Sequence, residues 1–414
     1  MGKKNSKDYC RILDKDDPIA FLRKKFSLPK GKINMDGNSL GALPKTTRKR
    51  LGEVIQREWG EGLIASWTDA GWFDLPTQLG NKIAPLIGAT KGEVLVADTT
   101  SINIFKLLCA AVQLNNDRKI LLSEKGNFPT DLYLMQGLAA FSEYQLVNKT
   151  VHPDSLLDAL DEDVAVLLLT HVNFKTAKIH DMVAITQRAH EKGILVIWDL
   201  SHSTGSIEVQ LNAAEVDFAV GCGYKFLNGG PGAPAFLYVA KKHQKKAQNI
   251  LSGWMGHKDP FAFTENYISA DGIARFRCGT PGILGMKALE CGIELFDHVS
   301  IQELRKKTLK LSRLFIQLME QECSDFGFKL ISPNDDKHRA GHIAYKHKNG
   351  LGIYQALRKE GIIIDFRMPN ILRFGITPMY LRYRDIYKTV KTVRKVMQTK
   401  AWDNPKYQIR GKIT

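Results

Sequence analysis

The sequence of 414 residues is first informative through what it lacks. It has no uncharged apolar run approaching the ~18 residues of a membrane-spanning helix, and no apolar stretch follows the basic residues at its start, so neither a membrane span nor a secretory signal is expected. Its six cysteines are scattered without a Cys-x-x-Cys spacing, which indicates reduced thiols in a cytoplasmic protein. Walker A and His-Glu-x-x-His patterns are also absent, and no metal site is expected.

Positive charge, by contrast, is abundant, with a formal net charge of +16. The basic residues concentrate in 241–246, 305–310 and 387–400, and in the last segment they alternate with apolar residues at helical spacing, which is typical of solvated helix faces. The sequence has no nucleic-acid recognition motif and no aromatic residues interleaved with the basic ones, so a nucleic-acid partner is not expected. The charge could instead attract an anionic cofactor and an amino-acid carboxylate, or support only weak adsorption to polyanions.

The distribution of apolar residues predicts two folded units and an N-terminal arm. From residue 94 onward, short apolar runs alternate with helical patterns, as in an α/β sheet covered on both faces. We therefore expect an arm (1–44) that packs against a neighbour or the small domain, a large doubly wound α/β domain (45–282) and a smaller α+β domain (283–414).

The expected elements follow from periodicity. Strands are predicted at 94–97, 119–122, 144–147, 164–170, 194–198 and 216–221, and helices at 45–60, 76–88, 102–113, 130–140, 155–160 and 183–192. In the small domain, helices are predicted at 283–298, 302–322, 351–359 and 383–397, and short strands near 328–331, 342–345 and 371–374.

Two residues at predicted strand ends are the most informative feature of the chain. Asp199 closes one buried strand, and Lys225 follows the next one between small residues and a Gly-rich loop. Side chains at the carboxyl ends of such strands meet in a cleft. A lysine there can form a Schiff base with pyridoxal phosphate, and an acid can keep the pyridine nitrogen protonated. Taken singly, the aspartate could be a helix cap and the lysine a solvated surface residue.

The sequence around these residues resembles kynureninase. The segment 199–239 resembles the cofactor-lysine segment of fold-type I pyridoxal phosphate enzymes, class V aminotransferases included. Further blocks that resemble kynureninase occur in the family's order, covering roughly residues 33–400: MDGNSLGALP (35–44), EWGEGLIASWTDAGWFDLPTQL (58–79), GNFPTD (126–131), WMGH (254–257) and RFRCGTP (275–281).

This resemblance implies a fold, an activity and an assembly. The fold would be that of the fold-type I pyridoxal phosphate-dependent transferases, with a large mixed sheet. The activity would be hydrolysis of L-kynurenine, and of 3-hydroxykynurenine as a further candidate, to anthranilate and L-alanine in tryptophan catabolism, the kynurenine pathway that also serves NAD biosynthesis. The enzyme would be a cytoplasmic homodimer with shared active sites.

A cofactor phosphate needs several donors. Residues 98–101 lie between a predicted strand and a helix, where the helix dipole and free N–H groups favour an anion, although a plain Thr or Ser cap is the alternative. The resemblance assigns Thr100, Ser101 and Tyr224 to the phosphate region. It also assigns Trp254 and Thr280 there, from the partner subunit.

The pyridine ring needs a stacking partner and an acid. Phe128 enters a predicted helix, where it could lie against the ring or simply pack in the core. The resemblance implies that Phe128 stacks on the ring and that Asp131 lies near its nitrogen alongside Asp199. Thr170 and His202 match further cofactor-contacting positions, although either could be an ordinary core residue.

The substrate carboxylate needs a cation. Arg373 stands inside an apolar strand, and a buried arginine requires either a bound carboxylate or an internal acidic partner. The resemblance favours the substrate, and it places Trp67 and Thr280 against the substrate's aromatic ring, a pair that resembles bacterial kynureninases that prefer unmodified kynurenine. Lys225, Asp199 and Tyr224 would carry the catalysis, with Tyr224 as acid and base.

Two alternatives stand beside this interpretation. A cysteine desulfurase or aminotransferase would share the fold, but a desulfurase needs a cysteine on a mobile small-domain loop, and Cys323 falls instead between a helix and a strand beside acidic residues. A catalytically idle, basic binding protein would have no physical need for Lys225, Asp199 and Arg373 together.

Overall fold

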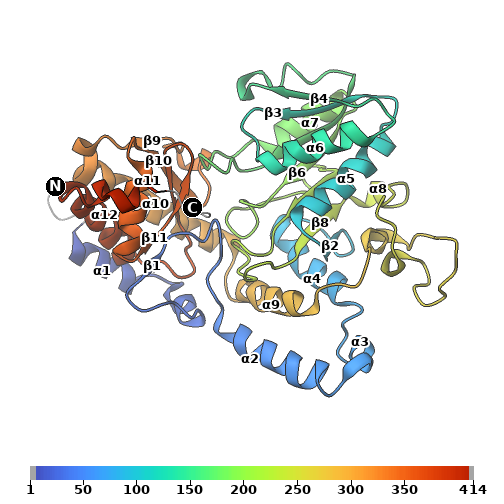
Figure 1. The fold of residues 1–414 in the computed structure, drawn as a ribbon, viewed down its shortest axis with the longest axis horizontal. Coiled ribbons are helices and arrows are strands. Elements are labelled where there is room, and N and C mark those ends of the chain that lie inside the picture. The colour runs from blue at the N-terminus through green and yellow to red at the C-terminus, as the bar shows by residue number, and fades with distance from the viewer. Residues whose placement is uncertain (1–5, 410–414) are drawn as a thin grey trace.

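The computed structural model describes residues 6–409. Figure 1 shows two bodies side by side, one built on a large sheet from the middle of the chain and one that contains both described ends. Among the described residues, no helix combines the length and apolarity that crossing a membrane requires.

The larger body is organised around a seven-stranded mixed sheet. Strands β3, β4, β5, β6 and β7 pair in parallel with one another, while β8 is antiparallel to both β7 and β2. This arrangement confirms the expected α/β fold class. In spatial order the strands are β2 (Val94–Ala97), β8 (Ala235–Val239), β7 (Phe218–Gly221), β6 (Leu195–Asp199), β5 (Val164–Thr170), β3 (Ile120–Glu124) and β4 (Val147–Val151).

Two separate apolar cores explain why the central strands are apolar throughout. Successive side chains of a strand point to opposite faces, and those of β5 alternate between the two cores. Helices α5 (Thr100–Leu114) and α6 (Pro129–Phe141) cover one face. Helices α4 (Leu75–Ile83), α7 (Met182–Glu191) and α9 (Ile283–Ile293) cover the other.

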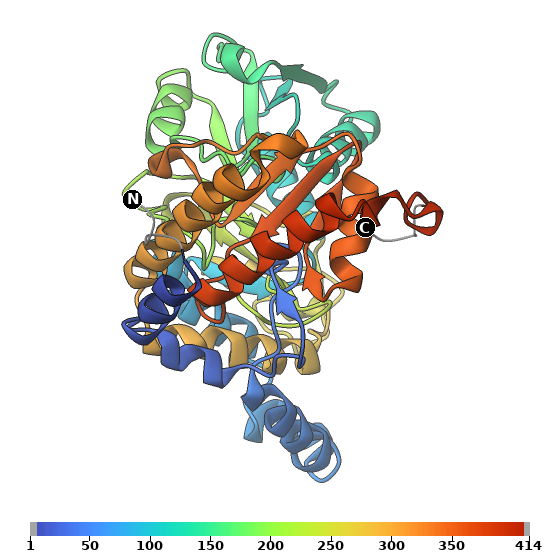
Figure 2. The same cartoon turned by 90° about the vertical axis from the view of Figure 1, so that its left-hand side faces the viewer.

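The smaller body has a four-stranded antiparallel sheet with helices packed on it. The strand order is β12 (Asp365–Arg367), β13 (Ile371–Gly375), β10 (His342–Lys346) and β9 (Lys329–Leu330). The long helices α10 (Ile301–Cys323) and α12 (Tyr383–Gln398) lie side by side in Figure 2, and α11 (Gly350–Lys359) packs next to α12. A capping box of Ser300 and Glu303 begins α10.

The N-terminal arm packs against the smaller body. Helix α1 (Lys7–Lys15), which the sequence analysis did not predict, lies along α12, and β1 (Ile33–Asn34) pairs in parallel with β11 (Ile362–Ile363). Helix α9 packs against α4 and α2 (Lys45–Glu53) of the larger body. The division at residues 44 and 282 stays a prediction.

Two predicted elements are wrong. The strand expected at 144–147 begins only at Val147, because β4 is an exposed edge strand of sequence VNKTV without the apolar pattern that a buried strand shows. The helix expected at 155–160 is a turn that follows the 3-10 segment Pro153–Ser155. Leu156 and Leu160 are buried and have helical spacing, but so short a segment does not sustain a helix alone.

Candidate active site

The carboxyl ends of the parallel strands bring the predicted ring-binding residues together. Asp199 ends β6 and lies directly opposite Thr170, the last residue of β5. Lys225 follows the end of β7, the next strand in the sheet. The side chains of all three are buried.

Lys225 lies in a pocket of aromatic rings and an imidazole. Its Nζ is 3.4 Å from His202 Nε2, 6.0 Å from the centre of the Phe128 ring and 5.8 Å from that of Tyr224. Burial lowers the pKa of Lys225, against the opposing influence of Cys222 and Asp199. The pKa of His202 is also lowered, first by burial and then by Lys225, so its imidazole is neutral. A neutral amine is the nucleophilic form of lysine.

A loop from the N-terminal arm closes over the Lys225 backbone. The Gly41 N–H donates to the carbonyl of Tyr224 at 2.8 Å. A Cβ atom on Gly41 would lie 2.3 Å from the Lys225 carbonyl oxygen, so this close approach requires glycine.

Asp131 and Asp199 lie close enough for the charge of Asp199 to act on Asp131. The Ser201 N–H donates to Asp199 Oδ1 at 2.8 Å, so Asp199 also shapes the turn after its strand. Burial raises the pKa of Asp199. Burial and then the negative charge of Asp199 raise the pKa of Asp131. A cation placed between these groups would restore the ionised form of the acid that faces it.

The residues around Lys225 fit pyridoxal phosphate. Thr170 Oγ1 and Asp131 Oδ2 are buried without a hydrogen-bond partner within the described chain, which leaves them able to bind a polar group of a ligand. Phe128 is half-buried and is the cap residue of α6, so part of its side chain is not covered by the core. An amine, a half-covered aromatic face and two carboxyl groups match the aldehyde, ring and pyridine nitrogen of that cofactor.

The predicted phosphate region lies at the start of α5. Thr99 caps this helix by accepting from the Ile102 N–H, and Thr100 and Ser101 form its first turn. A cavity of 390 Å³ near this end is lined by Asp98 and by residues 278–282, which include Thr280. Asp98, which precedes the cap residue Thr99, and Thr280 therefore line the same cavity.

The remaining predicted residues lie apart from Lys225. Trp67 packs edge-on against Trp72, with 5.9 Å between ring centres, and Trp254 packs in the same way against Phe261. Within residues 6–409, no hydrogen bond or ring contact joins Trp67 or Trp254 to Lys225. Helix α3 (Ser66–Asp69), which carries Trp67, projects from the body in Figure 1.

Arg373 has an internal acidic partner, Asp365, which was one of the two possibilities that the sequence left open. It is only 1% exposed, and both its Nε and Nη2 donate to Asp365 Oδ2, the former at 2.6 Å. Its Nη1 donates to the Phe174 carbonyl oxygen at 2.6 Å and its Nη2 to Ser39 Oγ at 3.2 Å. Substrate binding by Arg373 stays a prediction.

Several polar residues of the pocket were missed by sequence reasoning. Asp365 forms one ion pair with Arg373 and a second with Arg367. His342 has its ring 5.9 Å from that of His202, and burial lowers its pKa, so it is a neutral imidazole. Asp365 and Arg367 lie on β12 (DFR), which is only three residues long, so alternation gave no usable signal for them.

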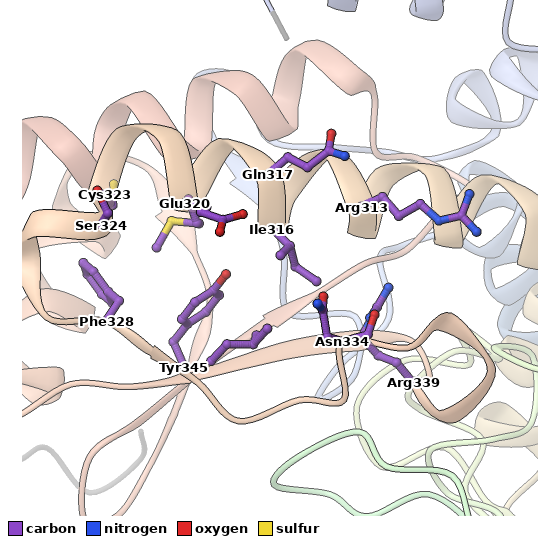
Figure 3. A pocket seen from close by; sticks show the side chains of 12 residues that line it. Arg313, Ile316, Gln317, Glu320, Cys323, Ser324, Phe328, Asn334, Arg339 and Tyr345 are labelled. Carbon is purple, nitrogen blue, oxygen red and sulfur yellow. The ribbon is translucent and has the colours of Figure 1, made fainter. Parts of the chain in front are cut away.

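Cys323 lines a different cavity, of 540 Å³, in the smaller body. Figure 3 shows it at the end of α10, with Phe328 and Tyr345 nearby and Arg313 and Arg339 farther along the groove. The Cys323 thiol is buried, and burial with the nearby Glu322 raises its pKa to about 12. It is therefore a protonated, structural thiol. Among the described residues, no cluster of His, Cys, Asp and Glu is suited to a metal ion.

Comparison with solved structures supports the fold. The apo cysteine desulfurase from Thermococcus onnurineus NA1 superposes with a TM-score of 0.77 over 92% of this chain and 98% of its own, at 17% sequence identity. At that identity the likeness shows the fold alone, and it confirms the expected fold-type I architecture.

Sequence comparisons are more specific. A family model described as the kynureninase C-terminal domain matches residues 304–393. The kynureninase of Burkholderia pseudomallei strain K96243 is 46% identical over 99% of this chain and 100% of its own length. That of Pseudomonas fluorescens is 44% identical over 98% of this chain and 99% of its own. Because these similarities extend over essentially the whole sequence, the chain belongs to the kynureninase family.

Proposed function

We propose that this protein catalyses the pyridoxal phosphate-dependent hydrolysis of L-kynurenine to anthranilate and L-alanine in tryptophan catabolism. The observation that carries the proposal is the meeting of Lys225 and Asp199 at one sheet edge, in a chain 46% identical to a curated kynureninase over 99% of its length. Pyridoxal phosphate, when bound, withdraws electron density from the substrate carbons next to the amino group.

Lys225 would hold the cofactor aldehyde and would then act as a base. The burial that lowers its pKa favours the neutral amine, which can attack an aldehyde and later take a proton from the substrate Cα. His202 is neutral and presents a nitrogen 3.4 Å from Lys225 Nζ, so it orients the amine without repelling it.

Asp199 supplies the negative charge that keeps the pyridine nitrogen protonated. The Ser201 N–H holds its carboxyl group in place, and Asp131 adds a second acid nearby. Thr170 and Phe128 would hold the ring, while Thr100, Ser101 and Tyr224 would hold the phosphate region.

Tyr224 is assigned the proton transfers that follow. Burial, with Cys222 and Asp199, raises the pKa of its hydroxyl, so Tyr224 carries its proton at neutral pH and donates before it accepts. One water molecule is added across the Cβ–Cγ bond of kynurenine in the complete reaction.

We further propose a homodimer in which Trp254 and Thr280 complete the site of the partner subunit, and Trp67 contacts the substrate ring with Thr280. Support comes from exposed apolar side chains near these residues, Ile64 and Phe263 above all, which a second copy would cover. Two inactive variants, Lys225→Ala and Thr280→Ala, test the arrangement when their subunits are mixed. Regained activity supports shared sites, and activity no higher than the sum of the two refutes them.

A cytoplasmic location is part of the proposal, supported by six cysteines that are all free thiols.

The activity itself is tested by incubating the purified holoenzyme with L-kynurenine, 3-hydroxykynurenine and L-cysteine. Anthranilate and alanine in equal amounts from kynurenine are expected, with a lower kcat/KM for the hydroxylated substrate. Turnover of cysteine alone would refute the proposal in favour of a desulfurase.

A further inference from the structure

A further cavity lies on the smaller body, between the N-terminal arm and the start of α12. Its volume is 670 Å³, within the range of about 300–1,000 Å³ that is usual for small-molecule pockets. Its lining residues come from α1, from the arm up to Ile33 and from 382–391, and α1 packs beside α12 in Figure 2. The cavity is therefore separate from the Lys225 pocket.

Basic side chains dominate the lining of this cavity. Nine of its fifteen lining residues are Lys or Arg, and one, Asp385, is acidic. Arg23 and Arg382 both donate to the carboxylate of Asp385, so two guanidiniums already share the single acid. Burial lowers the pKa of Arg23 against the influence of Asp385, and the positive charges of Arg382 and Arg384 lower it further. The cations in the cavity therefore outnumber the negative charge that could balance them.

Some of these cations have no acidic partner at all. The other paired cations use acids outside the lining, Asp8, Asp14 and Glu322. Four exposed lysines form no ion pair within residues 6–409: Lys7, Lys30, Lys32 and Lys388. A hollow lined by charges of one sign concentrates counter-ions of the other sign. The cavity is therefore suited to a ligand with several negative charges close together.

An aromatic ring borders the same cavity. Tyr387 is half-buried, and Lys391 Nζ lies 5.7 Å from the centre of its ring. Leu28 and Pro29 add apolar surface. A nucleobase can pack on such a ring, but an extended nucleic-acid strand uses several aromatic platforms in succession. Tyr387 stands alone as an aromatic among the described lining residues, which favours a single nucleotide.

We propose that this cavity binds a nucleoside di- or triphosphate, with the unpaired lysines on the phosphates and Tyr387 against the base. The proposal is independent of the proposed function, because the cavity shares no residue with the Lys225 pocket. It gives part of the net charge of +16 a specific role, in place of weak adsorption to polyanions.

Calorimetric titration of the holoenzyme with magnesium-free ATP tests the site. The double variant Lys32→Gln with Lys388→Gln removes one unpaired lysine from the arm and one from α12. The control, Lys306→Gln with Lys310→Gln, removes two exposed lysines of α10 that lie outside the cavity. The Kd for ATP should rise roughly 5- to 30-fold in the first variant, through loss of two partly exposed charge pairs, and should stay at the wild-type value in the control. Unchanged kynurenine turnover shows that each variant is folded, and the two single variants replace the double one if it is not.

Other ligands and one further variant identify the occupant. Inorganic tripolyphosphate should bind more weakly than ATP, and adenosine should not bind. Tyr387→Leu should weaken ATP binding without changing the Kd for tripolyphosphate.

Several results would overturn the proposal. Wild-type protein that does not bind ATP has no such site, and an equal loss in the α10 control would mean adsorption to the net charge. Tripolyphosphate that binds as tightly as ATP would make this an inorganic phosphate site. A short single-stranded oligonucleotide that binds more tightly than ATP, and loses affinity in the Lys32 and Lys388 variant, would identify a nucleic-acid partner instead.

Discussion

The buried ion pair between Arg373 and Asp365 makes a quantitative prediction possible. Both side chains are almost completely buried, and the carboxylate of Asp365 accepts from Nε and Nη2 of the guanidinium. Replacing Asp365 by Asn keeps the size and one oxygen acceptor but removes the negative charge. Arg373 would then be buried next to Arg367 with no opposing charge in contact.

The contacts of Arg373 set the expected loss of unfolding free energy in Asp365→Asn. Removing one partner of a buried pair typically costs about 3–5 kcal/mol, because an uncompensated charge remains in a region of low dielectric. Phe174 O and Ser39 Oγ still accept from Arg373 and partly offset the loss. We therefore expect the lower limit, about 3 kcal/mol of unfolding free energy, which corresponds to roughly 3–5 °C in Tm for a chain of this length.

Thermal unfolding of the holoenzyme measures the difference, with Glu360→Gln as the control. Glu360 pairs with Lys395 at 2.8 Å, but the Lys395 side chain is 60% exposed, so this pair should contribute less than about 1 kcal/mol. If Asp365→Asn lowers Tm no more than Glu360→Gln does, the reasoning about the buried charge is refuted.

Further predictions concern the catalytic pocket. Lys225→Ala should abolish turnover of kynurenine while weak cofactor binding persists, and measurable steady-state turnover in this variant would contradict its role. Asp199→Ala should lower kcat roughly a thousandfold at full cofactor occupancy, because its charge acts on the ring; a near-wild-type rate would exclude it. Asp36 lies beside Ser39 and close to Arg373, the predicted carboxylate ligand, and burial with the nearby Asp365 raises the pKa of Asp36 to about 6. As pH falls through that value Asp36 gains a proton and loses its negative charge, so the KM for kynurenine should fall roughly two- to fivefold between pH 7 and 5.5. Asp36→Asn should remove this dependence, and an unchanged pH profile in the variant would assign it to another group.

The large sheet was predictable because its central strands carry their own signal. The runs that form β5, β6 and β7 are short, apolar and buried on both faces. Polar residues stand at the end of each run or shortly after it. Asp199, Thr170 and Lys225 could be placed at one edge because parallel strands align their carboxyl ends. The exposed edge strand β4 lacks that pattern, and its start was predicted too early.

The carboxylate region was only partly predictable. Arg373 was recognisable as a cation inside an apolar strand, but its partner depends on the register between β12 and β13, which no periodicity in either strand reveals. Strand β12 is only three residues long, too short to identify from alternation. The competition of Asp365 for the donors of Arg373 therefore became visible only in the folded chain.

The central claim is that Lys225 at the sheet edge carries the cofactor of a kynurenine-cleaving enzyme. Borohydride reduction of the holoenzyme, followed by proteolysis and mass spectrometry of the peptides, tests it most directly. We predict a single pyridoxyl adduct on the peptide that contains Lys225, and less of it when borohydride is added while the enzyme is saturated with kynurenine. An adduct on another lysine, or none that kynurenine displaces, would contradict the account.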